Sequence, residues 1–149
     1  MKHSRLSLLC LRVALPLALC GVAASVAAKS EIKGAAILDH PCGKVAVKQM
    51  GLVHAGKMDD ANKLTTKQMQ DRWKEMPASD RSMMSGMMKE MSQSEDQFAT
   101  DIKSSGLLMV DGPAATLTVK KQTKDANGSS TSTTTQQFAI DGNQCLVSR

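Results

Sequence analysis

The sequence predicts a single α+β domain in which N-terminal helices pack on a C-terminal antiparallel sheet of about four strands. The length of 149 residues, with 42% hydrophobic and 22% charged residues, is typical of one globular domain. From residue 42 to about residue 101 the apolar residues recur with the helical period of about 3.6. After Gly106 the period changes to the value of about 2 that strands show, so helices precede the sheet.

Residues 1–28 have the composition of a secretory signal peptide. Three basic residues and no acidic one precede an apolar run over 13–27, and small residues lead to an expected cleavage site after Ala28. The run is shorter than the roughly 20 residues of a membrane-spanning helix and contains Pro16. We therefore expect a mature domain of residues 29–149 that is periplasmic or secreted and has no membrane anchor.

Charge and aromatic content argue against a nucleic-acid partner. Loss of the signal peptide removes three of the 19 basic residues and none of the 14 acidic ones, so the net charge falls from +5 to +2. The aromatic residues are Trp73, Phe98 and Phe138. Because single strands are bound by basic surfaces and stacked aromatic rings, we expect no nucleic-acid binding.

The first predicted helix of the mature chain has about 14 residues. Asp39 is its expected N-cap, Pro41 lies in its first turn, and Gly56 follows its C-terminus. His40 is expected to cap or flank this helix. His54, near the other end, is placed where an imidazole interacts favourably with the helix dipole.

Further helical segments follow, each with its own start. The second helix is expected to open at Asp59 or Asp60 and the third to run from Thr66, while Ser79 and Ser94 are the expected caps of the last two. The segment from Thr66 ends before Pro77, where a proline stops the helix. Ser94 and Gln97 form a capping box, and the last segment buries Phe98 and Ile102 before Gly106.

The predicted strands are separated by turn sequences. The first covers 107–110, and the second contains the alternating residues Ala115, Leu117 and Val119. Asn127-Gly128 marks a hairpin tip, the return strand covers 130–140, and the last strand covers 144–148. The segment 129–135 has no apolar residue, so we expect a solvated ribbon near the tip.

Two cysteines, Cys42 and Cys145, remain after signal cleavage. In an oxidising compartment they have one intramolecular pairing available, so a disulfide is predicted. It would close a loop of about 100 residues, worth about 4 to 5 kcal/mol in the chain-entropy model. Metal-binding or redox cysteine pairs use shorter spacings.

The segment 45–61, with a helix, a small-Gly-charged turn and an acid-capped second helix, resembles the opening of small exported bacterial proteins of the nuclear-transport-factor-like (cystatin-like cone) superfamily. The superfamily's final strand has a Gly-x-Trp-x-Ile-like pattern, whereas this chain has Gly-Asn-Gln-Cys-Leu at 142–146. The resemblance implies a cone-shaped pocket between sheet and helix, used for ligands, catalysis or pairing. The candidates for such a pocket are His54, Asp59, Asp60 and Trp73.

Catalytic chemistry has little support in the sequence. Only His40 and His54 remain as near-neutral bases, and both are assigned structural roles, so no catalytic residue is predicted. No phosphate-binding loop and no short His or Cys metal motif occurs, so no cofactor and no metal is favoured. We expect a non-enzymatic domain that binds an unidentified protein or small ligand. A minimal pocket enzyme that pairs His54 with Asp59 or Asp60 is an alternative.

Methionine is the residue type that exceeds its usual frequency. Ten of the 11 methionines follow residue 28, and seven fall between Met69 and Met91. Five of them form what we call the methionine row: Met83, Met84, Met87, Met88 and Met91. Helical spacing favours a buried core face, because methionine fills irregular core space. The alternatives are a surface for a protein partner and a Cu(I) site, since soft thioether sulfur selects Cu(I).

Overall fold

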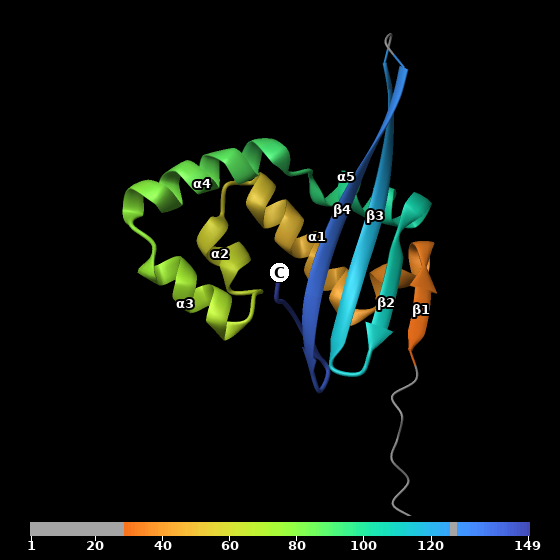
Figure 1. Ribbon diagram of the computed structural model, residues 1–149, viewed down its shortest axis with the longest axis horizontal. Helices are drawn as coiled ribbons and strands as arrows, with labels where there is room; N and C mark the ends of the chain where they lie inside the picture. The colour runs from red at the N-terminus through yellow and green to blue at the C-terminus, as the bar shows by residue number, and fades with distance from the viewer. Residues whose placement is uncertain (1–28, 126–127) are drawn as a thin grey trace, which may run out of the picture.

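The computed structural model describes residues 29–125 and 128–149 and confirms the predicted α+β class (Figure 1). The signal peptide expected at 1–28, and Asn127 of the expected hairpin tip, lie outside these residues. The elements in chain order are β1 (Ser30–Lys33), the 3-10 helix η1 (Gly34–Asp39), α1 (Pro41–His54), α2 (Met58–Asn62), α3 (Lys67–Glu75), α4 (Ala78–Met91), α5 (Glu95–Ser105), β2 (Leu107–Asp111), β3 (Ala114–Asp125), β4 (Gly128–Asp141) and β5 (Gln144–Val147).

The sheet has five antiparallel strands in the order β1-β2-β3-β4-β5. The prediction of about four strands missed β1, which pairs with β2 so that Ile32 lies opposite Leu108. Ile32 is the only apolar residue of β1, so this strand has no periodic pattern of its own. Its place in the sheet comes from pairing with β2, a contact that local sequence does not encode.

One face of the sheet carries the hydrophobic core. In Figure 1, α1 and α5 lie behind the strands, and α1 also packs on η1. The largest fully buried side chains are Phe98, Phe138, Ile37, Ile102, Leu108, Leu117 and Cys42. This burial confirms the predicted inward positions of the last helix and of the strand at 115–119.

The N-cap predicted for α1 is wrong by one residue. Asp39 ends η1, and His40 caps α1 by accepting a hydrogen bond at Nδ1 from the Cys42 N–H, at 3.2 Å. The chain turns directly from η1 into α1, so the cap falls on the residue before Pro41. Gly56 follows α1 with φ 72°, which confirms the predicted C-terminus.

Of the other two predicted caps, one is confirmed. Ser94 Oγ accepts a hydrogen bond from the Gln97 N–H at 3.3 Å, as a capping residue does. Ser79 is not the cap of α4, because this helix begins at Ala78 directly after Pro77. Pro77 occupies the N-cap position with φ −54°, and no side chain caps this helix.

The β3–β4 hairpin extends past the rest of the sheet (Figure 1). The β4 residues 129–135 are all exposed, which confirms the predicted solvated ribbon. At the opposite end the ribbon joins the core through Ala115 and Phe138, which are paired.

Cys42 and Cys145 lie at disulfide distance, with their Cα atoms 5.0 Å apart. The predicted pairing is therefore confirmed, and both cysteines are buried. The bond joins the first turn of α1 to β5, at the edge of the sheet.

Helices α2, α3 and α4 lie to one side of the sheet (Figure 1). The segment before α3 continues the sheet beyond β5, since the Thr66 N–H donates to the Val147 carbonyl at 2.9 Å and the Val147 N–H donates to the Leu64 carbonyl at 3.0 Å. Helix α4 packs on α1, and no residue of α3 or α4 is buried. None of the helices in the described part of the chain has the length and apolar character needed to cross a membrane.

Candidate functional site, a methionine-lined groove

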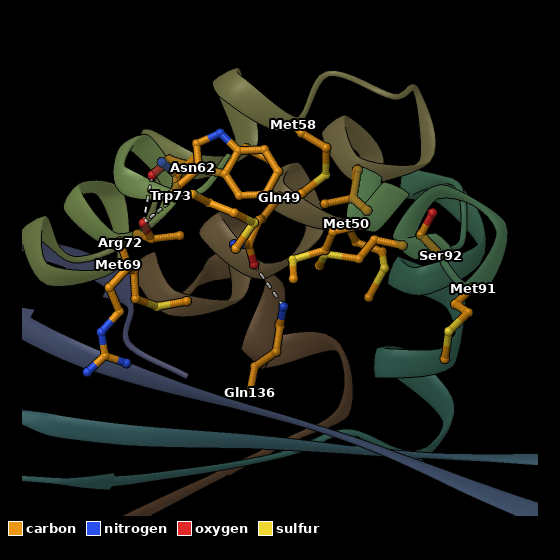
Figure 2. A pocket seen from close by; sticks show the side chains of 16 residues that line it. Gln49, Met50, Met58, Asn62, Met69, Arg72, Trp73, Met91, Ser92 and Gln136 are labelled. Carbon is orange, nitrogen blue, oxygen red and sulfur yellow. Dashed lines mark hydrogen bonds between the residues drawn. The ribbon is translucent and has the colours of Figure 1, made fainter. Parts of the chain in front are cut away.

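A cavity of about 480 Å³, which we call the groove, lies where α1, α2, α3 and α4 meet (Figure 2). Seven of its 16 lining residues are methionines: Met50, Met58, Met69, Met76, Met84, Met88 and Met91. Gln136 of β4 is the lining residue that the sheet supplies. The groove therefore lies mainly among helices, whereas the resemblance implies a pocket between sheet and helix.

Helical spacing explains how each wall forms. From α1 come Gln49, Met50 and Val53, which share one side of that helix. From α4 come Met84, Met88 and Met91, which are three or four residues apart and so lie on one side of the helix. The two sides face each other because α4 packs on α1.

The third wall comes from α3, through Met69, Arg72 and Trp73. The indole N–H of Trp73 donates to Asp59 Oδ1 at 2.9 Å, which links α3 to α2. Figure 2 shows Trp73 and Met58 on the side of the groove opposite Gln136. The indole ring is thus held by a hydrogen bond at its rim while it lines an apolar space.

The expectation that the methionine row is a buried core face is wrong. Met83, Met87 and Met91 are 65%, 58% and 83% exposed, and Met84 and Met88 are 39% and 41% exposed. Helix α4 packs on α1, and the core is filled by α1, α5, η1 and the strands. Met84, Met88 and Met91 line the groove, whereas Met83 and Met87 are outside its lining.

The polar part of the groove is centred on two amides. Gln136 Nε2 donates to Gln49 Oε1 at 3.0 Å, which ties β4 to α1 (Figure 2). Gln136 Oε1 is buried and accepts no hydrogen bond from any residue that the structure describes. A buried acceptor without a donor costs about 1 to 3 kcal/mol, so a donor from solvent or from a bound molecule would stabilise it.

Of the four residues predicted for a pocket, Trp73 lines the groove. Asp59 binds the indole, while His54 and Asp60 are exposed and outside the lining. The Lys63 ammonium, 2.7 Å from Asp60, lowers the pKa of that carboxyl by hydrogen bonding and charge attraction. Within the described ranges, no hydrogen bond or ion pair joins His54 to Asp59 or Asp60.

His40 has the structural position expected for it. Burial lowers the pKa of its imidazole, and the neutral ring accepts the hydrogen bond that caps α1. Residues 29–125 and 128–149 contain no group of three His, Cys, Asp or Glu side chains that could hold a metal ion. Seven methionine thioethers are the soft ligand atoms in the groove lining.

The sequence predictions missed most of the groove. Met50, Met58, Met69 and Met76 come from different segments, and nothing in their local patterns shows that they converge. The one available indication was the high methionine content of the sequence, 11 in 149 residues.

In comparisons with known proteins, no family model, curated protein or solved structure matches the chain.

Proposed function

We propose that the protein is an exported, non-enzymatic binding domain whose groove holds an apolar ligand. The observation that carries this proposal is the exposed, methionine-lined groove of about 480 Å³, which is within the usual range for ligand sites of about 300 to 1,000 Å³. Export is supported by the composition of residues 1–28 and by the disulfide, because such bonds persist in oxidising compartments.

Methionine suits such a site. Its unbranched thioether side chain adapts to irregular shapes, and methionine-rich surfaces accept ligands of different form. Contiguous exposed apolar surface is costly for a protein in water and marks binding sites. The groove is bounded by Met84 and Met88 on one side and by Trp73 on another, so it offers apolar contact from several directions.

Cu(I) binding is the second candidate. The observation that favours it is the position of the exposed residues Met84, Met88 and Met91 on one side of α4, in the groove lining. Three soft sulfur ligands are a set that selects Cu(I). The minimal pocket enzyme has less support, since His54 is outside the groove. The proposed resemblance to the cone superfamily stays a prediction.

The test uses two double variants of the same helix. Met84→Gln with Met88→Gln makes the groove polar, while Met83→Gln with Met87→Gln changes exposed methionines outside the lining. Glutamine has a helix propensity close to that of methionine, so α4 should remain intact in both. We expect an environment-sensitive apolar dye to bind the wild type and the control pair, and to bind the groove pair at least tenfold more weakly. Equal binding by both pairs would contradict the proposal.

A third variant separates the apolar ligand from copper. Replacing Met84, Met88 and Met91 by leucine removes the sulfur atoms and keeps apolar volume. We expect the dye to bind this variant about as well as the wild type, and neither protein to hold Cu(I) against a competing chelator. Tight Cu(I) binding that is lost in the leucine variant would instead support the copper site.

A further inference from the structure

We infer that the ligand of the groove is a single-chain amphiphile with one anionic head, a long-chain carboxylate, whose head binds Arg72. This inference rests on the proposed function and specifies the class of ligand. Its starting point is the charge on the lining: Arg72 is the one charged residue among the 16 described residues that line the groove.

Arg72 has no ionic partner among the residues that the structure describes. The neighbouring charges of α3 are different, since Lys67 Nζ lies 2.6 Å from Asp71 Oδ2 on the same helix. Arg72 is exposed and lines the groove together with Met69 and Trp73 of the same helix. An unpaired guanidinium beside a methionine-lined space is complementary to a ligand with an apolar body and an anionic end.

The position of Arg72 sets the orientation. Figure 2 shows Arg72 towards one end of the groove and Met91 towards the other, with Met50 between them. A chain placed along this line would contact thioethers throughout, while its head stays at the guanidinium and in contact with water. A two-ended ligand of this kind fits better than a compact apolar one.

The number of cations favours a carboxylate. A planar guanidinium binds a carboxylate through two parallel hydrogen bonds. A phosphate monoester has close to two negative charges at neutral pH, and the described lining provides one cation. A singly charged head therefore matches the site.

Binding in the groove can be followed by intrinsic tryptophan fluorescence. Trp73 is the only tryptophan, there is no tyrosine, and Trp73 lines the groove, so intrinsic fluorescence reports on this site. Laurate and dodecanol have the same chain length and differ in head charge, and each is titrated below its aggregation limit. The proteins are the wild type, Arg72→Gln and Lys74→Gln. Lys74 is the matched control, because it is exposed in the same last turn of α3 and outside the groove lining.

We expect the wild type to bind laurate more tightly than dodecanol. Arg72→Gln should weaken laurate binding by about three- to tenfold, as loss of one exposed charge-assisted contact does, and should leave dodecanol binding unchanged. Lys74→Gln should leave both affinities unchanged. Each methylene added to the carboxylate should strengthen binding by about fourfold until the groove is full.

The outcomes distinguish failure of the carboxylate inference from failure of the proposed apolar site. Equal affinities for laurate and dodecanol, or equal effects of Arg72→Gln and Lys74→Gln, would overturn the inference and leave the proposed apolar site in place. Absence of a fluorescence change with either ligand and with the apolar dye would overturn both.

Discussion

Removal of the disulfide is the change whose effect on the free energy of unfolding follows most directly from the structure. The variant Cys42→Ala with Cys145→Ala eliminates the bond between the first turn of α1 and β5. Alanine is preferred to serine because both cysteines are buried, where a new hydroxyl would need a hydrogen-bond partner.

The expected loss follows from the length of the closed loop. The two cysteines are 103 residues apart, and the chain-entropy model assigns about 4 to 5 kcal/mol to a loop of this length. Small domains have a total stability of about 5 to 15 kcal/mol, so the bond accounts for a large part of it. With a urea dependence of about 2 kcal/mol per molar, the unfolding midpoint should fall by roughly 2 M.

The assay is urea denaturation of the purified protein, followed by circular dichroism and by Trp73 fluorescence. The reduced wild type is the control, since it loses the bond without a change of sequence. An unchanged midpoint in the double variant would refute the argument. Two thiols that alkylate without prior reduction, detected by intact mass, would refute the bond itself.

Two further predictions concern α1 and its cap. Gly43→Ala should destabilise the protein by about 2 kcal/mol or more in urea denaturation, because a Cβ atom there would lie 1.8 Å from the Ile37 carbonyl oxygen. The control Gly86→Ala should be neutral or stabilising, because its Cβ atom would have no neighbour within 4 Å. Equal losses of stability in the two variants would contradict the packing argument. Burial lowers the pKa of the His40 imidazole below 6.5 in the folded protein. The stability that neutral His40 contributes should therefore be fully present above about pH 6.5, and it should be lost as the pH falls through the lowered pKa of the folded state. His40→Asn, which keeps a capping acceptor, should flatten this part of the pH profile, while the exposed-site control His54→Gln should keep it; a wild-type profile in His40→Asn would count against the assignment.

Periodicity was sufficient to predict where the helices give way to strands. Phe98 and Ile102 are on one side of α5, and Leu117 and Val119 alternate along β3. The spacing of these apolar residues therefore predicts which side of each segment is buried. β1 was not predictable in this way, because Ile32 is its only apolar residue. The position of such a strand depends on the neighbouring strand with which it pairs.

The candidate site was less predictable, for a related reason. Gln49 and Gln136 are 87 residues apart and meet only when α1 packs on the sheet, where it contacts β5. The methionine row identified the apolar side of α4, but spacing alone does not show whether a neighbour covers that side. Here the core is complete without α4, and the row is left at the surface beside the groove.

This arrangement separates stability from binding, and so allows each to be tested alone. Because α4 has no buried residue, Met84→Gln with Met88→Gln should change the free energy of unfolding by less than about 1 kcal/mol in total. By contrast, Phe98→Ala should cost about 3 to 5 kcal/mol, since that ring is fully buried in the core. Urea denaturation of the three proteins measures both values. Loss of ligand binding at unchanged stability would assign these methionines to recognition, whereas a loss of stability close to that of Phe98→Ala would assign them to the fold.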